Sequence, residues 1–500
     1  MKIPQFRLIA NILVGVTMMT FNAYSQNWTQ IGTDIDGTGN DNWLSSMDLS
    51  ADGSRLIVGE NSFSSAAFTT SGRVRVFELV GGDWILMGTE MYAESIGNGF
   101  GMSVRITPDG NTIVCGESRS DVSGNQSGQV RVYFWDGNNW QPKGSWIQGA
   151  TDAEFGSAVD INTDGTRISV GAPFPSNTNG VDEIGKIQIY EWNGTTWAQL
   201  GLDIVGDAAG DFFGANISMD MTGDVVAICG RANNSSTGQV KIYEWNGNSW
   251  IQRGIDLVGS GTGESYGTSV SLDADGNTLA IGAAFKSTNN GQVDVFNWDG
   301  TSWVLKGNSF VGSNGEWLGH SVDLSDDGNV LAYGAPFSDN GGLDAGYSKC
   351  YQWDGLTWGN VGNEIVGDAI HDYCGAFDIS LNSAGDYVAA MAYGNDDGGS
   401  YAGQTRVFSS PFASVSENIA LNQLSVFPNP TNDIIHVSSS DGSGNHRLEI
   451  TNNLGQLLLI SHFNGSINHE ISVSGLPNGM YFISIIEENR NTHFSTFIKN

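Results

Sequence analysis

Apolar and polar residues alternate in short segments along most of the chain, and the segments recur in a fixed order. The stretch from 250 to 303 contains WIQRGIDLVG, then YGTSVSLDADG, NTLAIGAAF and GQVDVFNWDGTSW. A period of two indicates strands with one buried face. Asp-Gly or Asn-Gly pairs between the second and third segments, and between the fourth and the next first, are typical of hairpin turns. The pattern predicts units of four antiparallel strands.

This four-segment unit recurs seven times between residues 26 and 410. The tryptophans that mark its start lie 56, 56, 57, 53, 53 and 55 residues apart: Trp28, Trp84, Trp140, Trp197, Trp250, Trp303 and Trp358. The array begins with a lone WTQIGTDI and ends with a lone GQTRVFSS. Pairing these two ends would close a ring without exposed edges. We therefore predict an all-β chain in which residues 26–410 form a seven-bladed β-propeller.

Several repeats resemble a known family. FGMSVRITPDGNTIVCGES, FGSAVDINTDGTRISVGAP, YGTSVSLDADGNTLAIGAA and LGHSVDLSDDGNVLAYGAP are similar to FG-GAP repeats, the units of integrin-α-like propellers. The resemblance implies that the FG-x-S-V strand is innermost and the Trp-led strand outermost. Because propellers host both binding and catalysis, the resemblance does not identify an activity.

The repeat stops after Phe408, and a different composition follows. We expect residues 411–424 to be a linker. Residues 425–500 contain no Trp, and their alternating segments are separated by Pro-Asn, Leu-Gly and Pro-Asn-Gly. This pattern predicts a small C-terminal β-sandwich.

Three ordered motifs in this tail resemble the type A C-terminal sorting domain of the type IX secretion system of Bacteroidota. They are VFPNP at 426–430, NLGQ at 453–456 and LPNGMY at 476–481, with a basic residue near the end. The resemblance implies a domain that is recognised by the type IX secretion machinery and then cleaved, with the propeller released or held at the cell surface. The alternative is an ordinary accessory β-domain. The candidate sorting residues are Asn429, Pro430, Gly455, Gly479 and Lys499.

The first 25 residues have the composition of a secretory signal peptide. Lys2 and Arg7 precede an apolar run that ends at Phe21, and Ala23-Tyr24-Ser25 precede Gln26. The small side chains of Ala23 and Ser25, at the −3 and −1 positions, indicate cleavage before Gln26, and the apolar run is too short for a membrane anchor. We expect a mature protein without a transmembrane segment, secreted or on the outer cell surface through Sec and type IX export.

Charge narrows the range of partners. The chain has 54 Asp+Glu against 21 Lys+Arg and a net charge of −33, of which −31 belongs to residues 26–410. Such a surface repels phosphates, so we predict no nucleic-acid binding. Cations, neutral glycans and basic protein surfaces remain as ligands.

Calcium is the one cofactor that the sequence suggests. Asp160, Asn162 and Asp164 precede Gly165 and alternate as oxygen donors, which suits a hard cation. The integrin-like loop would continue with an acid three residues after the glycine, where this chain has Ile168. The alternative is that Asp-Gly serves only as a hairpin turn.

Acids also recur in the long, variable loops, which lie at the opposite end of the strands from the Asp-Gly turns. Asp211, Glu264, Glu316 and Asp372 each stand three residues before the glycine equivalent to that of the FG motif. We expect any ligand to meet this end. The four acids either face that ligand or cap the turns of their own loops.

No catalytic motif is evident. Only His320 and His371 lie in the repeats, at unrelated positions. Pairs of Trp residues flank the hairpin turns. We expect them to pack against each other across the two strands; the alternative is that they stack against a sugar. We therefore predict a binding or adhesion protein rather than an enzyme, with a secreted carbohydrate-active enzyme or lectin as the alternative. A disulfide between Cys350 and Cys374 is a further alternative that the sequence leaves undecided.

Overall fold

The computed structural model describes residues 27–40, 43–64, 70–93, 97, 99–174, 184–410, 425–427, 429–438, 445–452, 457–464, 468–487 and 492–499. Within these residues helix is confined to two short turns, α1 (Asn233–Ser236) and α2 (Lys286–Asn289). The remaining regular structure is β-strand, so the predicted all-β class is confirmed. The chain divides into two compact units, Met1–Ala413 and Ser414–Asn500. The predicted signal peptide and the predicted linker lie outside the described residues.

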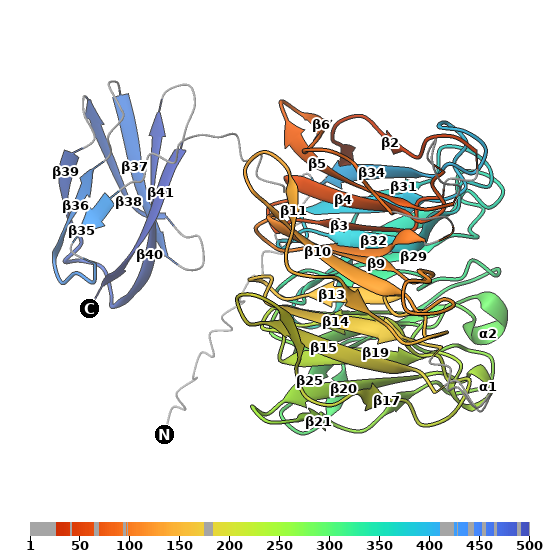
Figure 1. Cartoon of the computed structure of the whole chain (residues 1–500). Coiled ribbons are helices and arrows are strands. Elements are labelled where there is room, and N and C mark those ends of the chain that lie inside the picture. The colour runs from red at the N-terminus through yellow and green to blue at the C-terminus, as the bar shows by residue number, and fades with distance from the viewer. Residues whose placement is uncertain are drawn as a thin grey trace, which may run out of the picture. The chain divides into compact units, whose positions relative to one another are not determined.

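The described part of the first unit contains seven antiparallel sheets, one for each sequence repeat (Figure 1). In chain order they are sheet 1, β3 (Ser46–Leu49), β4 (Arg55–Glu60), β5 (Arg73–Val80), β6 (Asp83–Leu86) and β7 (Met91–Tyr92); sheet 2, β8 (Phe100–Ile106), β9 (Thr112–Glu117), β10 (Gln129–Trp135), β11 (Trp140–Pro142) and β12 (Ile147–Gln148); sheet 3, β13 (Ala158–Ile161), β14 (Arg167–Ala172), β15 (Lys186–Trp192), β16 (Trp197–Gln199) and β17 (Ile204–Val205); sheet 4, β18 (Phe213–Met219), β19 (Val225–Gly230), β20 (Gln239–Trp245), β21 (Trp250–Gln252) and β22 (Leu257–Val258); sheet 5, β23 (Ser269–Leu272), β24 (Thr278–Gly282), β25 (Gln292–Trp298), β26 (Trp303–Leu305) and β27 (Phe310–Val311); sheet 6, β28 (Val322–Leu324), β29 (Val330–Ala335), β30 (Tyr347–Trp353) and β31 (Trp358–Val366); and sheet 7, β32 (Cys374–Leu381), β33 (Tyr387–Ala392), β34 (Gln404–Ser409), β1 (Thr29–Gln30) and β2 (Ile35–Asp36).

Strand order is the same in every sheet, with the strand of the FG-like motif at one edge and the Trp-led strand at the other. The strands of the FG-like motif contact their counterparts in the neighbouring sheets all along the series, from β3 and β8 to β28 and β32. Strand β32 also contacts β3 of sheet 1. These strands therefore form a closed series, and they are called the inner strands below.

The two lone segments at the ends of the array complete one sheet. Strand β1 pairs with β34 through Thr29 and Ser409, and β2 pairs with the same strand through Ile35 and Thr405. The indole Nε1 of the buried Trp28 donates a hydrogen bond of 3.0 Å to the Val361 carbonyl of sheet 6. The edge of β34 is thereby covered by the start of the same array, as expected from the two lone segments.

One expected strand differs. WIQRGIDLVG is predicted as a single strand, whereas it forms β21 and β22, which both pair with β20. Gly254 lies between them with φ +84°, and a Cβ atom there would come within 2.9 Å of the Trp298 indole of the next sheet. The glycine both turns the strand and makes room for that ring. Equivalent glycines lie against the next indole in five other places: Gly32, Gly88, Gly144, Gly201 and Gly307.

Glycines also bring neighbouring sheets together near their inner edges. A Cβ atom on Gly282 of sheet 5 would lie 2.0 Å from the carbonyl oxygen of Gly319 of sheet 6. Gly319 occupies the glycine position of the FG motif, and Gly282 that of the third segment. The glycines of both motifs are thus explained by backbone contact between sheets.

The four cysteines, Cys115, Cys229, Cys350 and Cys374, are all buried and free. Burial raises the pKa of each thiol. Cys350 lies on β30 and Cys374 on β32, and no disulfide joins them.

The described part of the second unit contains two sheets, β35 (Ser425–Phe427), β36 (Ile434–Ser438) and β39 (Asn468–Ser472) in one, and β37 (Asn445–Asn452), β38 (Leu457–Asn464), β40 (Gly479–Glu487) and β41 (Thr492–Lys499) in the other. Buried residues of both sheets share one apolar core. It contains Ile435, Val437, Leu448, Ile450, Ile471, Val473, Tyr481 and Ile483. This unit therefore has a core of its own.

Candidate functional site

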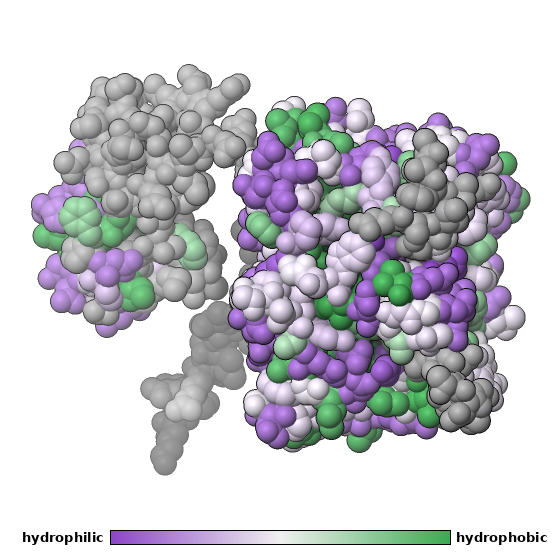
Figure 2. All heavy atoms as spheres, viewed as in Figure 1, coloured by the Kyte–Doolittle hydropathy of each residue, from purple (hydrophilic) through white to green (hydrophobic). Residues whose placement is uncertain are grey.

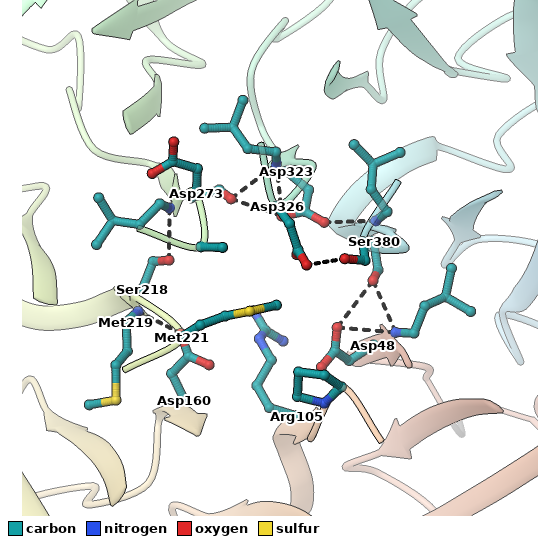
Figure 3. A pocket seen from close by; sticks show the side chains of 18 of the residues that line it. Asp48, Arg105, Asp160, Ser218, Met219, Met221, Asp273, Asp323, Asp326 and Ser380 are labelled. Carbon is teal, nitrogen blue, oxygen red and sulfur yellow. Dashed lines mark hydrogen bonds between the residues drawn. The ribbon is translucent and has the colours of Figure 1, made fainter. Parts of the chain in front are cut away.

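A cavity of about 160 Å³ lies among the inner strands of the first unit, and all seven sheets contribute to its lining (Figure 3). The lining includes the residues that directly precede the hairpin turns, such as Ala51, Pro108 and Thr163. The cavity is therefore at the Asp-Gly-turn end of the sheets. The sequence predicts ligand binding at the long-loop end, and no sequence motif marks this cavity.

One equivalent side chain from each inner strand faces the cavity. In sheet order these are Asp48, Arg105, Asp160, Ser218, Ser271, Asp323 and Ser380. Six of the seven accept a hydrogen bond from a backbone N–H of the next inner strand, at 2.7–3.1 Å: Ile106 to Asp48, Met219 to Asp160, Leu272 to Ser218, Leu324 to Ser271, Leu381 to Asp323 and Leu49 to Ser380. These carboxylates and hydroxyls join neighbouring sheets.

Arg105 interrupts this series. A guanidinium group has no acceptor atom, so it cannot accept the N–H of Ile161 in sheet 3. That N–H instead donates to the carboxylate of Asp160, its own neighbour, at 2.8 Å. A parallel series of backbone bonds between hairpin turns is interrupted at the same junction, because Pro108 has no N–H to donate. Sheets 2 and 3 are thus joined differently from the other neighbours.

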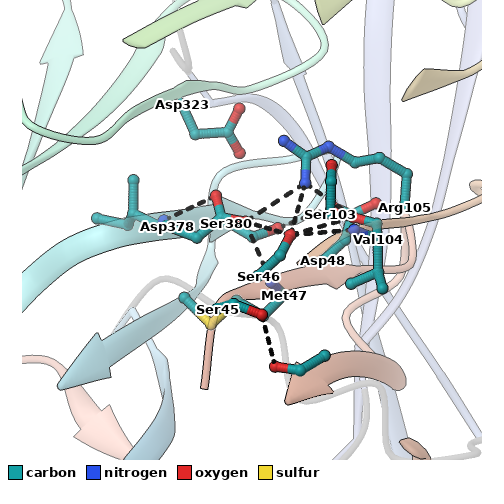
Figure 4. Close-up of polar contacts among 12 residues, drawn as sticks. Ser45, Ser46, Met47, Asp48, Ser103, Val104, Arg105, Asp323, Asp378 and Ser380 are labelled. Atoms are coloured by element: carbon teal, nitrogen blue, oxygen red, sulfur yellow. Dashed lines mark hydrogen bonds and ion pairs between the residues drawn. The ribbon is translucent and has the colours of Figure 1, made fainter. Parts of the chain in front are cut away.

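Arg105 supplies the positive charge among the cavity carboxylates (Figure 4). Its guanidinium lies 3.3 Å from Asp378 Oδ2 and donates to the Val104 carbonyl at 2.8 Å. Burial would lower the pKa of Arg105, but Asp378, Asp48, Asp160 and Asp323 outweigh it and raise that pKa. Arg105 is not among the residues predicted to form a site, although alignment of the repeats marks it as the one base at a position otherwise held by Asp or Ser.

The carboxyl groups that face the cavity have raised pKa values. Burial raises the pKa of Asp48 to about 7, partly offset by Arg105 and by the N–H of Ile106. Burial likewise raises the pKa of Asp323 to about 7. The pKa of Asp160 is raised for the same reason. The cavity can therefore take up protons near neutral pH, although its carboxylates already serve as acceptors between sheets.

The three calcium candidates do not converge. Asp160 faces the cavity, whereas Asn162 Oδ1 accepts the N–H groups of Thr166 and Arg167 at 2.9 and 2.8 Å. Asp164 accepts the N–H of Thr166 at 3.1 Å, at the exposed tip of the hairpin. Within the described ranges no group of three or more His, Cys, Asp or Glu side chains is placed to hold a metal ion. Asn162 and Asp164 make the contacts that a hairpin-turn role requires.

The four loop acids make local contacts. Each carboxylate accepts a backbone N–H three or four residues earlier in its own loop: Asp211 from Ala208 at 3.0 Å, Glu264 from Ser260 at 2.8 Å, Glu316 from Ser313 at 3.0 Å and Asp372 from Ala369 at 2.9 Å. Asp211 and Asp372 are also buried. These contacts are those of turn caps. A role in ligand binding stays a prediction.

The Trp residues hold the outer parts of the sheets together. Cross-strand partners such as Trp298 and Trp303 lie in register, with ring centroids 5.4 Å apart. The Trp that begins each repeat donates Nε1–H to a carbonyl of the preceding sheet, as Trp303 does to Arg253 at 3.1 Å. Across the seven repeats these bonds measure 2.8–3.1 Å. The repeating Trp positions thus have a structural role.

Sorting residues of the tail meet at the last strand, β41. Asn429 Oδ1 accepts the N–H of Ile498 at 2.9 Å, and Asn429 is followed by a cis bond to Pro430. Gly479 begins β40 and pairs in register with Lys499, whose side chain is buried. The entry motif and the end of the chain are therefore in direct contact. Gly455 lies outside the described residues.

Residues 425–500 match the family described as the secretion system C-terminal sorting domain. This part of the chain is a type IX secretion C-terminal sorting domain. The sorting domain supports export through the type IX secretion system, with a secreted or cell-surface location, and it implies interaction with that machinery.

Other comparisons are less informative. A search of curated proteins found no significant match. Similar solved structures include the hydrazine synthase of Kuenenia stuttgartiensis, with a TM-score of 0.46, 11% identity and coverage of 71% of this chain and 94% of that chain. A candidate 6-phosphogluconolactonase from Bacteroides uniformis has a TM-score of 0.44 and 13% identity, covering 65% of this chain and 85% of that chain. Likenesses at this level carry no inference about activity.

The surface offers few further signals. On the face shown in Figure 2, hydrophobic residues of the first unit are scattered in small groups among polar ones. In the part of the chain that the structure describes, neither helical turn approaches the length or apolar character needed to span a membrane.

Proposed function

We propose that this chain is an exported binding or adhesion protein that acts outside the cell. In this proposal residues 1–25 are a Sec signal peptide, residues 26–410 are a seven-bladed β-propeller of FG-GAP-like repeats that binds the ligand, and residues 425–500 are a β-sandwich that directs type IX export. The observation that carries the proposal is the sorting domain, because such a domain serves to deliver the protein attached to it.

Binding rather than catalysis is supported by how the conspicuous polar groups are used. Cavity carboxylates such as Asp160 and Asp323 accept N–H groups of neighbouring sheets. Loop acids such as Asp372 accept N–H groups of their own loops. Groups committed in this way are poor general acids or bases, since proton transfer would break contacts that hold the fold. A carbohydrate-active enzyme is the alternative.

The test is a screen of the mature chain, residues 26–500, against glycan and extracellular protein arrays, followed by product analysis on every ligand found. We expect saturable binding with no new reducing ends or unsaturated sugars. Turnover of a bound glycan would contradict the proposal and favour the enzyme. Failure to bind any glycan or protein ligand would contradict it as well.

A further inference from the structure

Six aromatic side chains at the long-loop end of sheets 6 and 7 form a closed series of ring contacts. Neighbouring centroids in this series lie 4.3–6.0 Å apart. The members, called the aromatic cluster below, are in order of contact Trp317, Phe337, Tyr373, Tyr393, Phe377 and His320. This is the end that carries the turns α1 and α2 (Figure 1). Among the described residues, the other closed series of ring contacts is a smaller one of three rings, Phe310, Tyr333 and Tyr351, between sheets 5 and 6.

Phe377 is the unusual member. Inner strand β32 carries one residue more than its equivalents, CGAFDIS against YGTSVS, and Phe377 is that extra residue. Its φ is +59°, a conformation that costs free energy for a bulky residue. Its side chain is nevertheless 50% exposed, so the core gains little from it. Trp317 and Tyr373 of the cluster share a positive φ, +57° and +53°, so the exposure of Phe377 is what sets it apart and leaves its ring available to a ligand.

The cluster has further exposed apolar neighbours. Leu343 is 55% exposed, Ile370 61% and Tyr401 40%, all in loops of sheets 6 and 7. The five other members of the cluster are partly exposed. A partly exposed group of rings that includes two phenols can pack against an apolar face while donating and accepting hydrogen bonds.

The charged groups around the aromatic cluster argue against both cationic and anionic ligands. Burial and Arg231 lower the pKa of His320 to about 4, so its ring is neutral at pH 7 and accepts the Phe377 N–H at 3.2 Å. The acids beside the cluster are already engaged: Glu316 and Asp372 cap their loops, and Asp344 lies 3.3 Å from His371. A cationic ligand would thus find no uncommitted carboxylate among these three. An anionic one would be repelled by the −31 charge of residues 26–410.

We propose that the aromatic cluster is the ligand site of this protein and that it binds an uncharged polysaccharide. Sugar rings combine C–H faces, which pack on aromatic rings, with hydroxyls that pair with phenols and backbone groups. Phe377 supplies the most exposed ring, and the Tyr373 and Tyr393 rings, stacked at 5.0 Å, support it. This inference rests on the proposed binding function and names its ligand class.

Affinity electrophoresis of the mature chain in gels containing galactomannan, xyloglucan or mixed-linkage β-glucan tests the site, with alginate, heparin and polylysine as charged probes. We expect retardation by at least one neutral polysaccharide and a roughly 10-fold weaker affinity for Phe377→Ala. Phe377→Leu keeps an apolar side chain and should lose affinity similarly. Phe174→Ala is the matched control, because Phe174 pairs with Phe212 at 4.8 Å at the corresponding place between sheets 3 and 4. Melting curves of all three variants should match the wild type.

The outcomes separate the site from the function. Neutral binding that is unchanged in both Phe377 variants, or weakened equally by Phe174→Ala, overturns the site and leaves the proposed function standing. Binding of alginate, heparin or polylysine without any neutral polysaccharide overturns the ligand class. If no neutral polysaccharide binds, the inference is overturned. The proposed function is overturned too only if the chain also binds nothing on the glycan and extracellular protein arrays. If the Phe377→Ala variant has a lower melting temperature than the wild type, the affinity of the Phe377→Leu variant tests the site instead.

Discussion

At the scale of single residues, repeated Gly and Trp positions are explained by contacts between neighbouring sheets. Trp303 packs beside Gly254 of the preceding sheet and bonds the Arg253 carbonyl next to it. The glycine admits the indole because it has no Cβ, and the indole satisfies a carbonyl at a break in the outer strand. The high Gly and Trp content follows from repeating this contact around the series.

Trp303→Phe tests this contact. The ring volume is largely kept but the Nε1–H bond to Arg253 is lost, so we expect the free energy of unfolding to fall by about 1–2 kcal/mol. Urea unfolding followed by circular dichroism measures it. Trp43→Phe is the control, since Trp43 is 43% exposed and does not occupy one of the repeating Trp positions. Equal effects of the two substitutions would show that the interaction between sheets contributes nothing.

Arg105 gives a pH-dependent prediction. The folded-state pKa of Asp48 and Asp323, about 7, exceeds the ordinary value of 3.8, so the folded state binds more protons between pH 4 and 7 and their contribution to stability falls as pH rises. Arg105→Ser removes the compensating charge. We expect it to destabilise the protein by about 1–3 kcal/mol at pH 8 and by less at pH 5, where the carboxyls are protonated.

Melting curves at pH 5 and pH 8 measure this effect, with Arg105→Lys as the control that keeps the charge. The Ser variant should melt lower than the Lys variant at pH 8, and the gap should narrow at pH 5. A gap that is the same at both pH values would mean that Arg105 acts through packing and not through its charge.

At the scale of elements, the sequence predicts the strands well and their contacts less well. Alternation and Asp-Gly turns identify the strands because both are local properties. The break at Gly254, the ring contacts of Phe377 and the cavity could not be predicted in this way, because each depends on residues far away along the chain. The spacing of loop acids such as Glu316 is evident in the sequence, but only the structure shows that they cap their own loops.

Strands β1 and β2 provide the prediction at this scale. Deleting residues 27–36 uncovers the edge of β34 and removes the buried Trp28. We expect a loss of stability of at least about 3–5 kcal/mol and a tendency to associate through the open edge. Urea unfolding and light scattering measure the two effects. Thr29→Ala should leave both unchanged, because it shortens only an exposed side chain of β1. A deletion variant with the stability and light scattering of the wild type would refute the role of this closure.

At the scale of the whole molecule, the chain consists of two units with different features. The first holds an acidic series of seven sheets with a cavity at one end and an aromatic cluster at the other. The second is the sorting domain, in which Asn429 accepts a hydrogen bond from strand β41, the strand that ends at Lys499. The sequence motifs predicted this domain because they are contiguous, whereas the aromatic cluster is assembled from separate loops and has no linear motif.

The most direct test of the account is the location of a chain that lacks residues 425–500, determined by cell fractionation and surface labelling of the producing bacterium. The full chain should reach the cell surface or the medium. The truncated chain should remain in the periplasm, folded and with the melting temperature of the first unit. Asn429→Ala is expected to reduce export partially, because it removes the contact with Ile498. Normal surface display of the truncated chain would contradict the account.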